Sequence, residues 1–291
     1  MIREKIQEGV LQKKIFMFVF YFFLANSLFG VDFSTAFGVH DVVVRDISTN
    51  GKPAHIQDGT SHTFGADVAI YAHHTTASGI NLLAKAKVFF DRDVDELDND
   101  HVPVWFDFLL DFDGEVYKLN ESNRILWYIY MDNRQNTVSC IEREVRQHIG
   151  LGWRFSYKDF FLATNAYSGF YYIEIDDDTP LERGYSRMEL DDGEASNVFE
   201  IEAGYGFLQD YTLYGKIKRY SANAGFEELE SDYELRFGYK ASFWQKDATL
   251  NLKIRYTQYD FSRFNEGHTL SVLPWDNDTL IEVYYKFPLV F

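Results

Sequence analysis

The sequence contains a single cysteine and only five prolines in 291 residues. One thiol, Cys140, cannot form an internal disulfide, and we interpret it as a small side chain packed in a strand rather than a reactive thiol. Basic residues are also scarce, because 28 Lys and Arg stand against 45 Asp and Glu, for a formal net charge of −17. This acidity argues against binding nucleic acid through its phosphates.

Long hydrophobic runs are missing after residue 30, and no later window repeats apolar residues at helical spacing. With a mean hydropathy of −0.28, the chain is not a helical membrane protein. Its one apolar run, 15–24, follows Lys13 and Lys14 and precedes small residues. This order predicts a signal peptide over 1–30, cleaved after Ser27 or after Gly30.

The chain is rich in short segments in which apolar and polar residues alternate, and 18% of its residues are aromatic. Alternation places every second side chain on the same face of a strand. Gly and Asx clusters separate the segments, as expected for turns. The pattern predicts about twelve strands, at 33–45, 60–72, 79–91, 102–115, 123–132, 138–156, 160–175, 196–208, 211–221, 231–244, 248–261 and 278–291.

The lengths of the predicted connections also alternate. Most odd-numbered ones are long, such as 46–59 and 176–195, whereas even-numbered ones are short, such as Gln209-Asp210. Long loops on one side and tight turns on the other are typical of outer-membrane barrels, and a soluble β-sandwich has no reason to sort its loops in this way. The sequence therefore predicts a transmembrane antiparallel up-and-down β-barrel over 31–291, with both termini in the periplasm.

The apolar face of each strand must be on the outside, because a charge facing lipid at mid-bilayer costs about 2–4 kcal/mol. The charged faces then meet in the lumen. Opposite charges on adjacent strands either fill and hold a narrow barrel or line a polar pore; we favour a small or occluded lumen. The predicted lumen residues are Asp107, Asp111, Glu142, Glu144, Arg146, Arg154, Glu200, Glu202, Lys216, Lys218, Glu234, Arg236, Lys253, Arg255, Glu282 and Lys286.

Aromatic and apolar residues at alternating positions end the chain: Tyr285, Phe287, Leu289 and Phe291. This ending resembles the closing strand of Gram-negative outer-membrane barrels, which implies recognition by the barrel-assembly machinery. Strand number and length are similar to those of autotransporter translocators. Polar stretches at 132–137, 182–187 and 273–278 also fit that family, although passenger and pore helix are missing. The resemblance implies a solitary barrel in the bacterial outer membrane.

Acidic residues are dense in two predicted loops, 91–101 and 176–194. They suggest an alternative function, in which the loops bind divalent cations or a partner at the surface. An outer-membrane hydrolase is a weaker alternative, since the only adjacent Asp-His pair on the long-loop side is Asp100-His101. No G-x-S-x-G, H-E-x-x-H or Gly-rich phosphate loop occurs. We therefore expect a non-enzymatic monomer without cofactor or metal, whose partners are membrane lipid and lipopolysaccharide.

Overall fold

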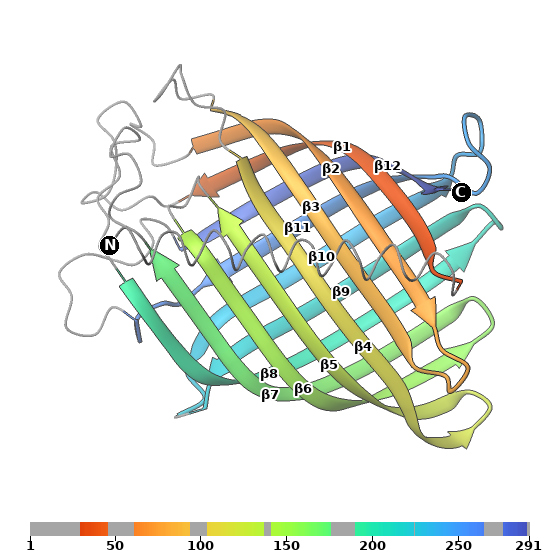
Figure 1. Cartoon of the computed structure of the whole chain (residues 1–291), viewed down its shortest axis with the longest axis horizontal. Helices are drawn as coiled ribbons and strands as arrows, with labels where there is room; N and C mark the ends of the chain where they lie inside the picture. The colour runs from red at the N-terminus through yellow and green to blue at the C-terminus, as the bar shows by residue number, and fades with distance from the viewer. Residues whose placement is uncertain are drawn as a thin grey trace.

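The structure, a computed structural model, describes residues 30–45, 61–93, 104–136, 141–175, 190–223, 225–264 and 276–289. These residues form one closed antiparallel barrel, in which each strand pairs with its neighbours in sequence and β1 pairs with β12 (Figure 1). The predicted all-β, twelve-stranded barrel is thereby confirmed. The strands are β1 (Asp32–Arg45), β2 (Ser61–Thr75), β3 (Asn81–Asp93), β4 (Val104–Asn120), β5 (Asn123–Asn136), β6 (Ile141–Tyr157), β7 (Phe160–Ile175), β8 (Leu190–Phe207), β9 (Tyr211–Ala222), β10 (Glu228–Lys240), β11 (Thr249–Tyr259) and β12 (Asn277–Leu289).

The outer wall of the barrel is apolar and the interior is polar. On β11, Leu250, Leu252 and Ile254 are 40, 40 and 38% exposed, whereas the intervening Asn251 is 9% exposed and Thr257 is fully buried. This arrangement is the reverse of a soluble protein and matches a barrel whose wall faces lipid. Within the ranges that the structure describes, no helix is able to span a membrane.

Two predicted strand boundaries differ most from the structure. The connection predicted at 116–122 is mostly strand, because β4 continues to Asn120 and only Glu121 and Ser122 form the turn. Register shifts between Glu115 and Tyr117, and again before Asn120, interrupt the alternation on which the prediction relied. The second error concerns β8, which begins at Leu190 opposite Ile175 rather than at 196.

The longer strands also remove residues from the predicted acidic loops. Asp91 lies in β3 and is buried, and Asp191, Asp192 and Glu194 lie in β8. Most of the remaining loop carboxylates, together with Asp100 and His101, are outside the described residues. The loop-binding and hydrolase alternatives therefore remain predictions.

Packed side chains narrow the interior toward the end of the barrel opposite the tight turns. The segment after β11 places Phe261 and Phe264 against Tyr171 of β7, with both phenylalanines at most 5% exposed. Tyr220 and Leu229 join the same cluster. A second cluster lies on other strands and consists of Val42, Val44, Phe89, Trp105 and Leu280. The lumen is consequently narrower at this end than twelve strands alone would make it.

The aromatic residues of β12 belong to the outer face near the tight turns. Phe287 stacks on Phe37 of β1, with ring centroids 6.1 Å apart. The Tyr285 hydroxyl donates to the carbonyl of Ala241 at 3.0 Å and accepts the amide of Gln245 at 3.3 Å. These two hydrogen bonds connect the turn between β10 and β11 to β12. Phe291, the last residue of the predicted assembly signal, is outside the described residues.

Candidate functional site: the charged lumen

The interior contains a cavity of about 340 Å³ that eight cationic and seven anionic side chains line. It reaches from Leu83 and Tyr214, toward the tight turns, to Arg134 and Tyr220 near the opposite ends of their strands. Eleven of the residues predicted from sequence line it: Asp107, Asp111, Arg146, Glu200, Glu202, Lys216, Lys218, Glu234, Arg236, Lys253 and Arg255.

Four other predicted lumen residues, Glu144, Arg154, Glu282 and Lys286, do not line the cavity. Glu144 and Glu282 are at most 3% exposed, and Arg154 Nη2 is 3.7 Å from Glu202 Oε1. The Lys286 ammonium lies 4.0 Å from the ring centre of Tyr71. The side chain of Glu142 is outside the described part of the molecule.

Charges of opposite sign alternate from strand to strand around part of the ring. Glu200 is opposite Lys218 and Glu202 is opposite Lys216 between β8 and β9. On the next strands, Glu234 is opposite both Lys216 and Arg255. Residues that are opposite in register do not all form close ion pairs, and Lys218 Nζ is 3.5 Å from Glu200 Oε2. Charged side chains of the lining are therefore compensated by several neighbours of opposite sign rather than by a single partner.

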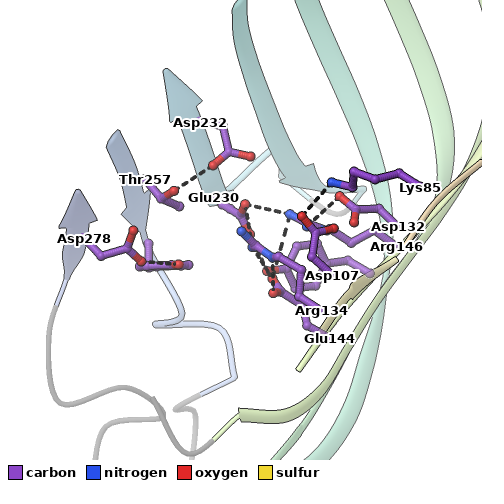
Figure 2. Close-up of polar contacts among 12 residues, drawn as sticks. Lys85, Asp107, Asp132, Arg134, Glu144, Arg146, Glu230, Asp232, Thr257 and Asp278 are labelled. Atoms are coloured by element: carbon purple, nitrogen blue, oxygen red, sulfur yellow. Dashed lines mark hydrogen bonds and ion pairs between the residues drawn. The ribbon is translucent and has the colours of Figure 1, made fainter. Parts of the chain in front are cut away.

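One group of buried charges joins opposite walls of the barrel. We call it the cross-lumen cluster, and Figure 2 shows most of its members. Glu230 of β10 accepts Arg134 Nη2 of β5 at 2.9 Å and Arg146 Nη1 of β6 at 2.7 Å. Four strands separate β5 from β10 in the ring, so these contacts cross the lumen. The cluster consists of Asp132, Arg134, Glu144, Arg146, Tyr171 and Glu230.

Every cationic member of this cluster has a second partner on its own wall. Arg134 Nε donates to Glu144 at 2.8 Å, and Arg146 Nη2 donates to Asp132 at 2.8 Å. The Tyr171 hydroxyl lies within hydrogen-bond distance of both Glu144 and Glu230 and donates its single proton to one of them. The two guanidinium groups are thus held between opposite walls of the barrel.

The sequence prediction missed Asp132, Arg134 and Glu230. Alternation along β5 places Asp132 and Arg134 on the inner face, but the strand was expected to end at 132. Glu230 was assigned to a loop, because the strand was expected to begin at 231. Asp132 was the last residue of its predicted strand and was not assigned to the lumen. Correct strand ends would have identified Arg134 and Glu230 as inward-facing residues.

A second buried group surrounds His40 of β1. Its Nδ1 is 3.1 Å from Asp67 Oδ2 and its Nε2 is 2.6 Å from Asp91 Oδ1. Lys87 Nζ lies 3.0 Å from Asp67 and 2.8 Å from Glu282, so that it links β2, β3 and β12. This site depends on a glycine: a Cβ at Gly65 would lie 2.8 Å from His40 Nε2 and 2.4 Å from a backbone oxygen. We call these residues the His40 cluster.

A buried histidine and serine also meet inside the barrel. His148 Nε2 is 2.8 Å from Ser196 Oγ, but within the described chain its Nδ1 has no partner. Ser196 is fully buried and neither residue lines the cavity. A nucleophilic serine needs substrate access and a group that orients the histidine, so this pair is packing rather than a catalytic dyad. The described residues also contain no group of three or more side chains suited to a metal ion.

Neither a family model nor a curated protein matches the chain. Among solved structures, an outer-membrane channel of the COG4313 group from Pseudomonas putida F1 has a TM-score of 0.50 at 8% identity, covering 89% of this chain and 95% of its own. The NanC porin has a TM-score of 0.48 at 10% identity, with 88% and 100% covered. Outer membrane phospholipase A from Escherichia coli has 0.44 at 11%, with 87% and 89% covered. At such identities the comparison shows the fold alone.

Proposed function

We propose that this chain is a non-enzymatic outer-membrane barrel whose lumen is a narrow polar passage for small solutes. The observation that carries the proposal is the charged cavity of about 340 Å³ inside a barrel with an apolar outer wall. In a purely structural barrel, the inward-facing side chains would be expected to fill the lumen without leaving a polar cavity. The cross-lumen cluster makes the passage narrow, and the alternative outcome is a sealed structural barrel.

The proposal includes a location and an orientation. The apolar wall fits a bilayer, and in such barrels short turns face the periplasm. The start of β1 and the end of β12 lie at the end with the tight turns, which supports termini in the periplasm (Figure 1). A cleaved signal peptide over 1–30, a monomeric state and contact with lipopolysaccharide are parts of the same proposal. The most specific element of the proposal is that the chain is a solitary barrel of autotransporter type, which rests on the sequence resemblance.

Planar-bilayer recording tests the passage directly. We expect purified, folded protein to give small conductance steps, because the cross-lumen cluster narrows the lumen. Selectivity between K⁺ and Cl⁻ should be weak, since cationic and anionic lining residues are nearly equal in number. The measurement is the single-channel conductance and the reversal potential in a KCl gradient. Folded protein that gives no steps would refute the passage and leave a sealed barrel.

The end of β12 gives a separate prediction about assembly. Replacing Phe287 with alanine should lower the amount of folded barrel in the outer membrane, because the assembly machinery is proposed to read this face. Phe37→Ala is a matched control, since the two rings stack on each other and either change removes the same contact. Heat-modifiable protein in the membrane fraction is the readout. Equal losses in both variants would contradict an assembly role for Phe287.

A further inference from the structure

Two cations that line the cavity have donors without acceptors. Within the described chain, neither Lys216 of β9 nor Arg255 of β11 makes a side-chain hydrogen bond or an ion pair within 4.0 Å, and the Nε of Arg255 is buried without a partner. Arginine carries five N–H donors in a planar fork, and lysine carries three. Donors that face a polar cavity in this way are available to a ligand rich in acceptor oxygens.

The two residues are part of a larger positive surface on β9, β10 and β11. Lys216 and Arg255 flank Glu234 in register, and Arg236 is opposite Lys253 one step along the same strands. All four cations line the cavity. We call Lys216, Arg236, Lys253 and Arg255 the lumen cation patch.

The carboxylates around this patch form close hydrogen bonds with only some of its donors. Glu234 accepts a single guanidinium, Arg236 Nη2, at 2.5 Å. Asp232 accepts the Thr257 hydroxyl at 2.8 Å and Glu202 accepts the Tyr214 hydroxyl at 2.8 Å. Glu282 is 2.8 Å from Lys87 and 3.5 Å from Lys253. Among the described residues, Glu234 therefore lies between Lys216 and Arg255 in register, but its close partner is Arg236.

We propose that the lumen cation patch binds the oxyanion group of a small solute, a carboxylate or a phosphate, during its passage through the barrel. This inference rests on the proposed function and names the class of solute. Guanidinium and ammonium donors form charge-assisted hydrogen bonds with such groups, and arginine does so with two parallel bonds. The low effective dielectric of the surrounding protein strengthens these bonds relative to bulk water. A volume of about 340 Å³ accommodates a small organic acid or a phosphate ester.

Calorimetry on the full-length folded barrel in detergent tests the inference, with sodium phosphate and disodium succinate as probes at constant ionic strength. Saturable binding of at least one probe is expected, and binding of both would indicate that the shared oxyanion chemistry is recognised. In the double variant Lys216→Gln/Arg255→Gln, affinity should fall by roughly tenfold or more, because charge-assisted hydrogen bonds are lost. Lys286→Gln is the matched control, a lumen lysine outside the cavity lining, and its affinity should be unchanged.

Several results would overturn the inference. The first is that neither probe binds to the wild type. The second is that Lys286→Gln lowers the affinity as much as the double variant does, which would indicate unspecific electrostatic attraction. If the double variant does not fold, Arg255→Lys keeps the charge but removes the planar fork; weakened binding supports the site and unchanged binding refutes it. Conductance recorded in parallel separates this inference from the proposed function. A conducting barrel without binding refutes only the patch, and binding without conductance refutes only the passage.

Discussion

Replacement of Glu230 by alanine should raise the single-channel conductance of the barrel several-fold. Among the residues that the structure describes, Glu230 is the only carboxylate that reaches across the lumen from β10 to Arg134 and Arg146. Its removal abolishes the bridge and leaves a space where the two walls met. The fold should tolerate the change, since Arg134 keeps Glu144 at 2.8 Å and Arg146 keeps Asp132 at 2.8 Å. Single-channel recording in KCl, compared with the wild type, measures the effect.

Two variants define the cause of this increase. Glu228→Ala removes the same side chain two residues away, where Glu228 pairs with Arg219 at 3.1 Å rather than with the cross-lumen cluster. Its conductance should equal that of the wild type. Glu230→Gln keeps the size but not the charge, and an intermediate conductance is expected. If Glu230→Ala conducts like the wild type while remaining folded, the cross-lumen cluster does not obstruct the passage.

A large loss of stability is expected from Lys87→Met. Lys87 lies between Asp67 and Glu282, whose side chains are 1 and 4% exposed. Removing the ammonium leaves two buried carboxylates without their closest cation, and breaking a buried ion pair costs about 3–5 kcal/mol. We expect about 3 kcal/mol, the lower end, because Asp67 keeps His40 and Glu282 keeps Lys253. Urea unfolding in lipid vesicles measures the change.

Two further variants test whether the expected loss of stability in Lys87→Met comes from the buried carboxylates rather than from the loss of a lysine in general. Lys118→Met removes an exposed ion pair with Glu121 and should change stability little. The double variant Lys87→Met/Glu282→Gln should recover part of the loss, since one of the two uncompensated carboxylates is gone. A Lys87→Met barrel as stable as the wild type would show that the His40 cluster compensates its own charges without the ammonium.

Alternation was sufficient to predict the barrel, and it failed where the backbone departs from regular pleating. β7 matches its prediction of 160–175, because its alternation is uninterrupted. The end of β4 was missed because register shifts place two residues opposite one. Lateral charge neighbours such as Glu200 and Lys218 follow from register and were predictable. The bridge from Arg134 to Glu230 was not, because it depends on the cross-section of the barrel rather than on the pairing of adjacent strands.

The pairing of β1 with β12 limits how a barrel of this kind can change in size. Loss of one strand would expose two rows of backbone N–H and C=O groups to hydrocarbon, where each unsatisfied group costs several kcal/mol. An odd number of strands would also force two neighbours to run parallel at the point of closure. Growth or shortening is therefore expected to occur by whole hairpins, while the sequences at the rim are free to diverge one residue at a time.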